Sequence, residues 1–376
     1  METLAQPGLG LTLAAFVLVV GVLVFVHEFG HYGVARLFGI RVETFSVGFG
    51  HPLLAWTDRR GTHWQIGWLP LGGYAKFAGD MNAASQPDPA LAALPEAERR
   101  ELFQFRPLWQ RALVVAAGPA INFLFAILLF AGFFMTFGQQ VTPPVVGQVV
   151  EGSPAEAAGL RPGDRVLAID GRSVSRFEDM TRLVAINPGR PVAMRVLRDG
   201  AVETVRVTPR VVVEEDRFGN VIRRGVLGIR SGEVELVRRG PVSALWHGAV
   251  ETWHTTRLMW DTLVQVVTGR RALDELGGPV RIAQFSGQSA SLGLAALVSF
   301  MALISVNLAF INLLPIPMLD GGHLLLYAIE ALRRRPLGPK VQEWAFVSGF
   351  ALLVSLMLFL TWNDLAALGL WDRLAN

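Results

Sequence analysis

The sequence of 376 residues contains no cysteine. Disulfide frameworks, thiolate metal ligands and cysteine nucleophiles are therefore excluded. Charge is also scarce, because Asp, Glu, Lys and Arg make up only 17% of the residues, against about 25% in an average soluble domain. Lysine occurs only at positions 76 and 340, and no basic cluster with interleaved aromatics supports a nucleic-acid partner. Apolar residues make up 52% and the mean hydropathy is +0.41, which indicates a membrane protein.

Four apolar runs are long enough to cross a bilayer, which takes about 20 such residues; they cover residues 8–26, 112–138, 292–314 and 344–362. The first run has no basic n-region and no small-residue cleavage site, so we expect a span and not a cleaved signal peptide. Between the second and third runs, alternating stretches near 192–197 and 204–207 predict strands joined by a turn at Asp199-Gly200. The sequence therefore predicts a polytopic α-helical membrane protein with four transmembrane helices and an inserted β-rich domain.

A second β element is expected between the first two spans. Residues 41–77 alternate apolar and polar side chains and are rich in glycine. Trp56, Trp64 and Trp68 suit a sheet held at the membrane interface. Residues 80–100 are rich in alanine, proline and acids, and we expect a mobile loop there.

Four parts of the chain follow from these patterns. Residues 1–138 are expected to form an N-terminal membrane part, and residues 139–235 a domain outside the bilayer. Residues 236–290 hold an expected amphipathic helix at the outer membrane face and a linker, because their apolar side chains recur at helical spacing. Residues 291–376 form the C-terminal membrane part.

The charges of the short loops predict the orientation. The loop after the first span carries eight basic residues, namely Arg36, Arg41, Arg59, Arg60, Lys76, Arg99, Arg100 and Arg106. The loop after the third span carries Arg333, Arg334, Arg335 and Lys340, whereas residues 1–8 carry none. We therefore expect both loops to be cytoplasmic, and both termini and the 139–235 domain to be extracytoplasmic.

The first span leads into His27-Glu28-Phe29-Gly30-His31, an HExxH pattern. On a helix, positions i and i+4 share a face, so two imidazoles can hold one Zn²⁺ while the glutamate serves as general base. Chance matches to this short pattern occur, and a helix end can also extend polar side chains into the headgroups. An ionisable cluster at the end of a transmembrane helix nevertheless predicts a functional site.

A catalytic zinc site needs a third protein ligand and an open position. Asp320 is the better candidate, because it follows a helix broken by Pro315 and Pro317 and lies on the same predicted side of the membrane as His27. His323 is an alternative ligand. The Asp-Gly-Gly sequence at 320–322 could also be only a turn.

Several motifs together resemble the site-2 protease family of intramembrane zinc metalloproteases, in its bacterial RseP-like branch. They are HEFGH (27–31), PLGGYAKF (70–77), AAGPAINFLFA (116–126), GSPAEAAGLRPGDRVLAIDG (152–171) and ISVNLAFINLLPIPMLDGGHLL (304–325). The resemblance covers nearly the whole chain in the family's order. It implies Zn²⁺ ligands at His27, His31 and Asp320, with Glu28 as the catalytic base. It also implies a substrate-binding set, which comprises Gly72, Gly73, Asn307, Asn312, Pro315 and Pro317.

The segment 153–174 resembles a PDZ domain of the circularly permuted bacterial type, and GVLGI (225–229) resembles its carboxylate-binding loop. Many RseP-like proteins carry two such domains, whereas this sequence has one signature. The family resemblance implies an inner-membrane endopeptidase that cleaves transmembrane segments of single-pass proteins, of the anti-sigma-factor or remnant-signal-peptide type. Such substrates are first trimmed by a separate site-1-type protease. The membrane lipid is the other expected partner.

Two other functions are compatible with parts of this sequence. A non-catalytic scaffold would bind partners through the PDZ-like segment, but it has no need of an intact HExxH together with Asp320. A metal transporter would also place histidines and acids in a bilayer. It predicts polar residues along several spans, whereas here they gather at one depth.

Overall fold

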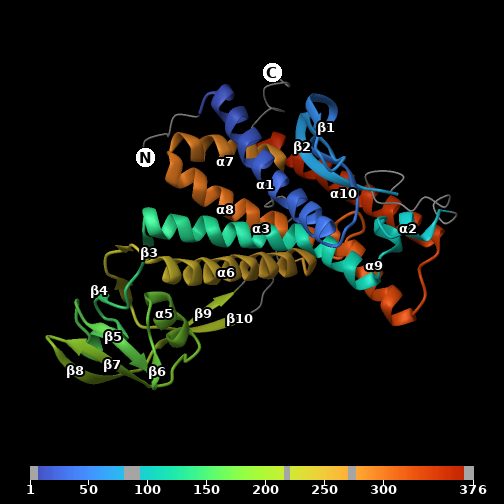
Figure 1. Ribbon diagram of the computed structural model, residues 1–376. Helices are drawn as coiled ribbons and strands as arrows, with labels where there is room; N and C mark the ends of the chain where they lie inside the picture. The colour runs from blue at the N-terminus through green and yellow to red at the C-terminus, as the bar shows by residue number, and fades with distance from the viewer. Residues whose placement is uncertain (1–6, 80–93, 216–220, 270–276, 368–376) are drawn as a thin grey trace. The chain divides into compact units, whose positions relative to one another are not determined.

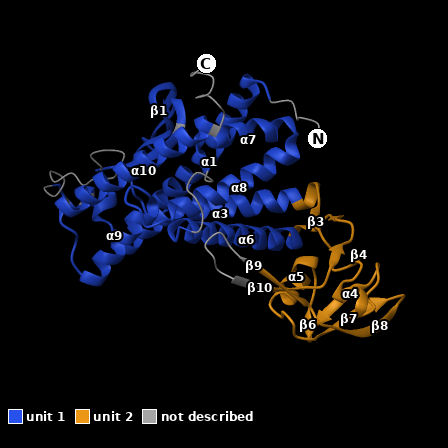
Figure 2. Cartoon of the chain, turned by 180° about the vertical axis from the view of Figure 1, so that it is seen from behind, with its two compact units in different colours: residues 1–133, 242–376 blue, residues 134–241 orange. Residues whose placement is uncertain are grey.

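The computed structural model describes residues 7–79, 94–215, 221–269 and 277–367. The chain forms two compact units, one made of residues 1–133 and 242–376 and the other of residues 134–241 (Figure 2). Within unit 1 the described elements are α1 (Leu9–Leu37), β1 (Val42–Thr57), β2 (His63–Phe77), α2 (Glu96–Arg99), a 3₁₀ turn (Phe103–Phe105), α3 (Leu108–Thr136), α6 (Pro241–Val267), α7 (Pro279–Ser291), α8 (Leu294–Asn312), α9 (Asp320–Arg333) and α10 (Pro339–Ala367) (Figure 1).

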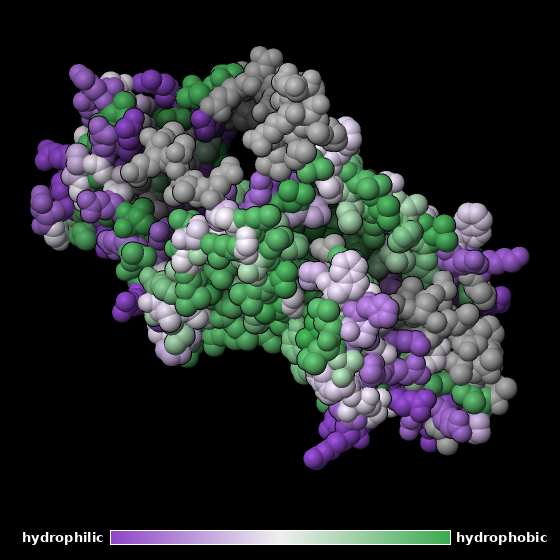
Figure 3. Space-filling model, turned by 90° about the horizontal axis from the view of Figure 1, so that it is seen from above, coloured by the Kyte–Doolittle hydropathy of each residue, from purple (hydrophilic) through white to green (hydrophobic). Residues whose placement is uncertain are grey.

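Four of these helices, α1, α3, α8 and α10, are long and apolar enough to cross a membrane. Only 11% to 39% of the most apolar stretch of each helix is buried inside the protein. The remainder exposes large side chains such as Leu13, Leu18 and Phe350. Figure 3 shows hydrophobic side chains gathered over a continuous part of the surface, flanked by hydrophilic ones. Apolar surface of this extent is typical of a protein surrounded by lipid.

The helix that carries the histidine pair does not end where the sequence suggested. Residues 8–26 were expected to form the span, with the HExxH pattern at its end, but α1 continues to Leu37. His27 and His31 therefore lie inside a regular helix, more than a turn before its end. This geometry guarantees that the two side chains share one face.

The β element of unit 1 is a folded-over hairpin. Residues 44–47 of β1 pair with residues 63–66 on one side and with residues 73–76 on the other. Residues 52–57 of β1 pair in turn with the first part of β2. Within the described part of the chain, the end of β2 therefore pairs with β1 on one side and has no strand on the other, so it forms an edge. Phe45 and Phe77 anchor the element against Tyr32 of α1 and Val114 of α3 in one buried cluster.

The segment between residues 236 and 291 differs from the expectation of one amphipathic helix followed by a linker. It contains two helices, α6 and α7. The buried face of α6 carries Ala244, Gly248, Thr252 and Thr255, and Gly248 packs on the backbone of α3 at Ile127. The apolar side chains that suggested the helix, including Trp246 and Trp253, are exposed instead. α7 is short and polar, so its apolar pattern is too weak to be recognised from the sequence.

The buried carboxylate of Asp364 stabilises the start of α7. It accepts hydrogen bonds from the backbone amides of Gly278 (3.2 Å) and Arg281 (3.0 Å). A Cβ at Gly278 would lie 2.8 Å from Asp364 Oδ2 and 3.0 Å from the backbone of Leu360, so glycine allows α7 and α10 to meet. This contact gives the Gly277-Gly278-Pro279 sequence a structural role.

The expected loop at 80–100 is only partly visible. Residues 80–93 lie outside the described residues. The last part, Glu96–Arg99, forms one helical turn with an exposed ion pair between Arg100 and Glu96. Glu96 and Glu98 stabilise this turn because negative charge is favourable at the N-terminus of a helix. The composition of residues 80–100 did not indicate a helix.

Unit 2 covers the region for which the sequence predicts a β-rich domain. Its elements are β3 (Gln139–Val141), β4 (Val146–Val149), α4 (Pro154–Ala157), β5 (Arg165–Ile169), β6 (Arg172–Ser173), α5 (Phe177–Ala185), β7 (Val192–Arg198), β8 (Ala201–Val207), β9 (Arg210–Glu215), β10 (Val221–Val226), β11 (Ile229–Ser231) and β12 (Glu235–Val237). One sheet has the order β6-β5-β7-β8, and three two-stranded pairs complete the unit. Its core includes Val166, Met180 and Met194.

Local turn chemistry decides the main hairpin of unit 2. β7 and β8 pair in register and are joined by Asp199 and Gly200, both at positive φ. Two central residues with positive φ define the type I′ turn, whose twist matches that of the strands. The hairpin predicted from Asp199-Gly200 is therefore confirmed.

Candidate active site

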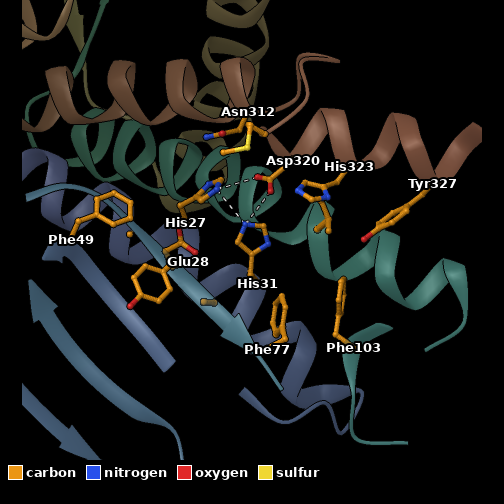
Figure 4. Close-up of a pocket in the computed structure, with 15 residues that line it drawn as sticks. His27, Glu28, His31, Phe49, Phe77, Phe103, Asn312, Asp320, His323 and Tyr327 are labelled. Carbon is orange, nitrogen blue, oxygen red and sulfur yellow. Dashed lines mark hydrogen bonds and ion pairs between the residues drawn. The ribbon is translucent and has the colours of Figure 1, made fainter. Parts of the chain in front are cut away.

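The two histidines of α1, at positions 27 and 31, and Asp320, the first residue of α9, meet in unit 1. His27 Nε2 lies 3.1 Å from Asp320 Oδ2, and His31 Nε2 lies 3.5 Å from Asp320 Oδ1. The two Nε2 atoms are 3.3 Å apart. Figure 4 shows all three side chains pointing to a common point. No other group of at least three potential metal ligands is found among the described residues.

The spacing of these three atoms fits a metal ion. Ligands at about 2.0–2.1 Å from a tetrahedral zinc lie about 3.3–3.4 Å from one another. The observed separations of 3.1, 3.3 and 3.5 Å bracket that value. Asp320 Oδ2 is buried and, apart from the 3.1 Å contact with His27 Nε2, has no hydrogen-bond partner among the described residues, so a lone pair is available at the same point. Two imidazoles and one carboxylate are also a known ligand set for catalytic zinc.

Two glycines explain how Asp320 reaches the histidines. α8 ends at Asn312, and the segment with Pro315 and Pro317 turns back before α9 begins. A Cβ at Gly321 would collide with the carbonyl groups of residues 313 and 314, and one at Gly322 would lie 2.7 Å from Pro317 Cα. The glycines let this segment pack under the first turn of α9. Asp320 is therefore the first residue of a helix, and the alternative that residues 320–322 form only a turn is wrong.

A third helix, α3, completes the site. His31 Nδ1 donates to the backbone carbonyl of Val114 at 2.9 Å. The side-chain amide of Asn122 lies 3.1 Å from His27 Nδ1. Gly118 lies between them, and a Cβ at this position would collide with the His31 ring and lie 2.9 Å from His27 Cε1. These three positions are spaced by four residues, so they form one stripe on α3 that faces the histidine pair.

These three α3 residues were not assigned a role from the sequence. They lie within or beside the AAGPAINFLFA motif, whose function the sequence left open. One signal was available, because Asn122 is an amide within an uncharged apolar run and polar groups at membrane depth indicate function. Val114 acts through its backbone and could not have been recognised.

The histidines and Asp320 open into a cavity of about 520 Å³. Glu28 lines it, together with Gly73, Tyr74 and Ala75 of the edge of β2. Further lining residues are Phe49, Phe77, Phe103, Val115, Asn312, Met318, His323 and Tyr327 (Figure 4). The cavity places a carboxylate, the metal-binding cluster and an extended strand around one space.

The structure separates the residues expected to bind substrate. Asn312 and Gly73 line the cavity, whereas Asn307, Pro315, Pro317 and Gly72 are not among the described residues that do. Asn312 donates to the backbone carbonyl of Leu308 at 3.0 Å, and the Asn307 side chain is half-buried. His323, the alternative ligand, lines the same cavity but lies outside the ligand cluster. The substrate-binding roles stay predictions.

Unit 2 has a cavity of its own. It has a volume of about 200 Å³ between α5 and the segment around β10 and β11, and it is lined by Met180, Val184, Leu227 and Ile229 among others. The GVLGI sequence therefore borders an apolar groove, with Gly228 at positive φ. A Cβ at Gly228 would collide with Ser153, which caps α4.

Comparison with known proteins gives the following similarities. A protein of Rhizobium meliloti (strain 1021), whose name includes the words zinc metalloprotease, is 45% identical over 368 residues, covering 96% of this chain and 98% of that protein. Metalloprotease MmpA of Caulobacter vibrioides is 40% identical over 384 residues, covering 95% and 96%. Among solved structures, the PDZ domain of an SdrC-like protein from Listeria innocua aligns with 25% of this chain and 98% of its own length, at 22% identity and a TM-score of 0.19.

The family model described as Peptidase family M50 matches residues 15–356. That range includes His27, Glu28, His31 and Asp320. The resemblance to site-2 proteases inferred from the motifs is thereby confirmed. This chain belongs to peptidase family M50.

Proposed function

We propose that this protein is a zinc-dependent intramembrane endopeptidase that cleaves transmembrane segments of single-pass membrane proteins. The observation that carries the proposal is the cavity in which Glu28, the His27–His31–Asp320 cluster and the edge of β2 meet. Neither a scaffold nor a transporter requires a general base such as Glu28 and a strand edge that can pair with a peptide beside the metal ligands.

His27, His31 and Asp320 are the proposed zinc ligands, which leaves one position of a tetrahedral site open. Zinc bound there supplies Lewis-acid activation of water and of the scissile carbonyl. The Glu28 carboxylate takes the proton of the attacking water and passes it to the leaving amine nitrogen. Because Glu28 follows His27 directly on α1, the helix holds its carboxylate beside the cluster.

The edge of β2 is the proposed substrate cradle. A transmembrane helix satisfies all its backbone amides internally, so a peptide bond becomes accessible only when the helix unwinds locally. An extended peptide can then add to a strand edge through main-chain hydrogen bonds. Gly73 suits this role, since its backbone lies against α1, and a Cβ there would lie 3.2 Å from Glu28 Cγ. Asn312, which also lines the cavity, is a second proposed contact. The proposed substrate-binding residues outside the cavity lining are Gly72, Asn307, Pro315 and Pro317.

The proposed location is the bacterial inner membrane, with both termini and unit 2 outside and the cavity near the cytoplasmic side. The distribution of arginines among the short loops supports this orientation. Unit 2 is the proposed PDZ domain, which controls substrate access through the apolar groove beside α5. The proposed substrates are of the anti-sigma-factor or remnant-signal-peptide type and reach the site after trimming by another protease.

The test uses the purified full-length protein and a panel of single-pass substrates, with and without a zinc chelator. We expect chelator-sensitive cleavage within the transmembrane segment by the wild type and none by Glu28→Gln. Cleavage that survives both chelation and Glu28→Gln would refute the proposal. Orientation can be tested with single cysteines introduced into each loop, because the chain has no native cysteine to react. Labelling of the loop at 59–60 from the outside would contradict the proposed topology.

A further inference from the structure

The stripe of α3 that faces the histidine pair contains one polar side chain, that of Asn122. This residue is fully buried, and the side-chain partner that the described structure gives it is His27 Nδ1, at 3.1 Å. Its backbone carbonyl accepts a hydrogen bond of 2.8 Å from Ser305 Oγ of α8. The backbone of Asn122 is therefore tied to α8, while its side-chain amide points to His27.

The hydrogen-bond requirements of the two rings decide what Asn122 does. Val114 presents a carbonyl, which can only accept, so His31 must carry its proton on Nδ1 and keep the lone pair on Nε2. His27 needs the same arrangement to bind a metal through Nε2. This requires an acceptor at its Nδ1.

Asn122 can supply that acceptor in one of its two amide orientations. The oxygen and nitrogen of an amide exchange places on a 180° rotation and are assigned from their hydrogen bonds. With the nitrogen toward His27, Oδ1 is buried without a partner, and the proton of His27 is driven to Nε2. With the oxygen toward His27, the NH₂ group of Asn122 is unpaired instead. His27 then carries its proton on Nδ1, and its Nε2 lone pair faces His31 and Asp320. Only the second orientation is compatible with a metal in the cluster.

We propose that Asn122 is the positioning residue of His27: its Oδ1 accepts the Nδ1–H bond and fixes the ring with Nε2 toward the metal. The proposal rests on the proposed zinc centre. α3 thus orients both histidines, through a backbone carbonyl for His31 and a side chain for His27. Partners of this kind fix the orientation and the proton position of a histidine ligand, and their loss typically costs about 10–100-fold in metal affinity.

The experiment compares zinc affinities of the full-length protein in detergent, by competition with a chromophoric chelator. Asn122→Leu removes the acceptor at nearly constant volume, and Asn122→Asp keeps an oxygen acceptor. Thr252→Val is the matched control, because it removes a buried hydroxyl of unit 1 whose partner in the described structure is the Gly248 carbonyl of its own helix. The melting temperature of each zinc-free protein is measured alongside.

We expect Asn122→Leu to bind zinc about 10–100-fold more weakly than the wild type. Asn122→Asp should stay within about threefold of the wild type, since a carboxylate also accepts from Nδ1–H. Thr252→Val should not change the affinity. Wild-type affinity in Asn122→Leu would overturn the proposal.

If Asn122→Leu does not fold without zinc, Asn122→Asp decides the question. The alternative is that Asn122 only packs and accepts no hydrogen bond from His27. In that case a buried carboxylate would be unfavourable, so Asn122→Asp would bind zinc more than about 100-fold more weakly and would unfold at a lower temperature. That result would also overturn the proposal, whereas retained zinc would support it. A wild type that binds no zinc would instead refute the proposed function itself, so the two failures are distinguishable.

Discussion

Replacing Gly118 with alanine tests the geometry of the metal cluster most directly. An added Cβ would collide with His31 Nε2 and lie 2.9 Å from His27 Cε1. Carbon and nitrogen atoms normally approach no closer than about 3.4 Å, so one ring or α3 itself must move by roughly 1 Å. Zinc–ligand distances tolerate only about 0.2 Å. The substitution should therefore disrupt the ligand set while it leaves the ligands chemically intact.

The effect on stability should be small, because two contributions oppose each other. Alanine in place of glycine inside a helix stabilises by about 0.5–1 kcal/mol. Overpacking in a close-packed site costs about 1–3 kcal/mol. The free energy of unfolding of the zinc-free protein should thus fall by at most about 2.5 kcal/mol. Zinc affinity, in contrast, should weaken roughly 10–100-fold, as it does when the support of a histidine ligand is lost.

Gly132→Ala is the matched control, since it lies in the same helix and its added Cβ would meet no atom within 4 Å among the described residues beyond the neighbouring backbone of α3. Both variants gain the same helix propensity, so only the collision with the histidines distinguishes them. The assay is chelator competition for zinc, with thermal unfolding of the zinc-free proteins beside it. Wild-type zinc affinity in Gly118→Ala would refute the reasoning, because it would mean that the cluster does not bind the metal at the observed geometry.

Four further outcomes follow from the same structure. Glu28→Gln should keep its zinc but cleave about 10²–10⁴-fold more slowly, because an amide accepts no proton; wild-type turnover would exclude Glu28 as the base. Asn312→Leu should lower cleavage of helical substrates more than of substrates with helix-breaking residues near the scissile bond, at unchanged zinc content, whereas equal losses would favour a packing role. In unit 2, burial alone would raise the pKa of the Asp164 carboxyl, but hydrogen bonds from Arg198 at 2.6 and 2.7 Å outweigh it and hold the pKa below its ordinary value. The stability from this pair should be fully present above about pH 4 and be lost as the pH falls through the lowered pKa, which hydrogen exchange of residues 134–241 in the full-length protein can follow. Arg198→Met should destabilise unit 2 by about 3 kcal/mol at pH 7, since it removes the ion-pair partner of the buried Asp164 and leaves the Arg161 backbone amide at 2.8 Å as its hydrogen-bond donor. An unchanged exchange profile would contradict this.

Features that depend on local pattern were recognised from the sequence. The four apolar runs became α1, α3, α8 and α10, with ends shifted by a few residues, and by eleven residues at the end of α1. The HExxH spacing predicted that His27 and His31 share a face, because helix geometry alone decides it. The hairpin at Asp199-Gly200 followed from the turn that these residues favour.

Features that depend on contacts between distant segments were decided only by the tertiary structure. The sequence left Asp320 and His323 open as ligands, and the packing of residues 313–317 against Gly321 and Gly322 brings Asp320 to the histidines. Whether Asn307 or Asn312 reaches the cavity depends on where α8 ends. Gly118 and Asn122 have no periodic pattern of their own, and their roles follow from the contact between α3 and the histidines of α1. Periodicity records which face of a helix is apolar, but the partner of that face is selected by shape and hydrogen bonding between segments that lie up to hundreds of residues apart in the chain.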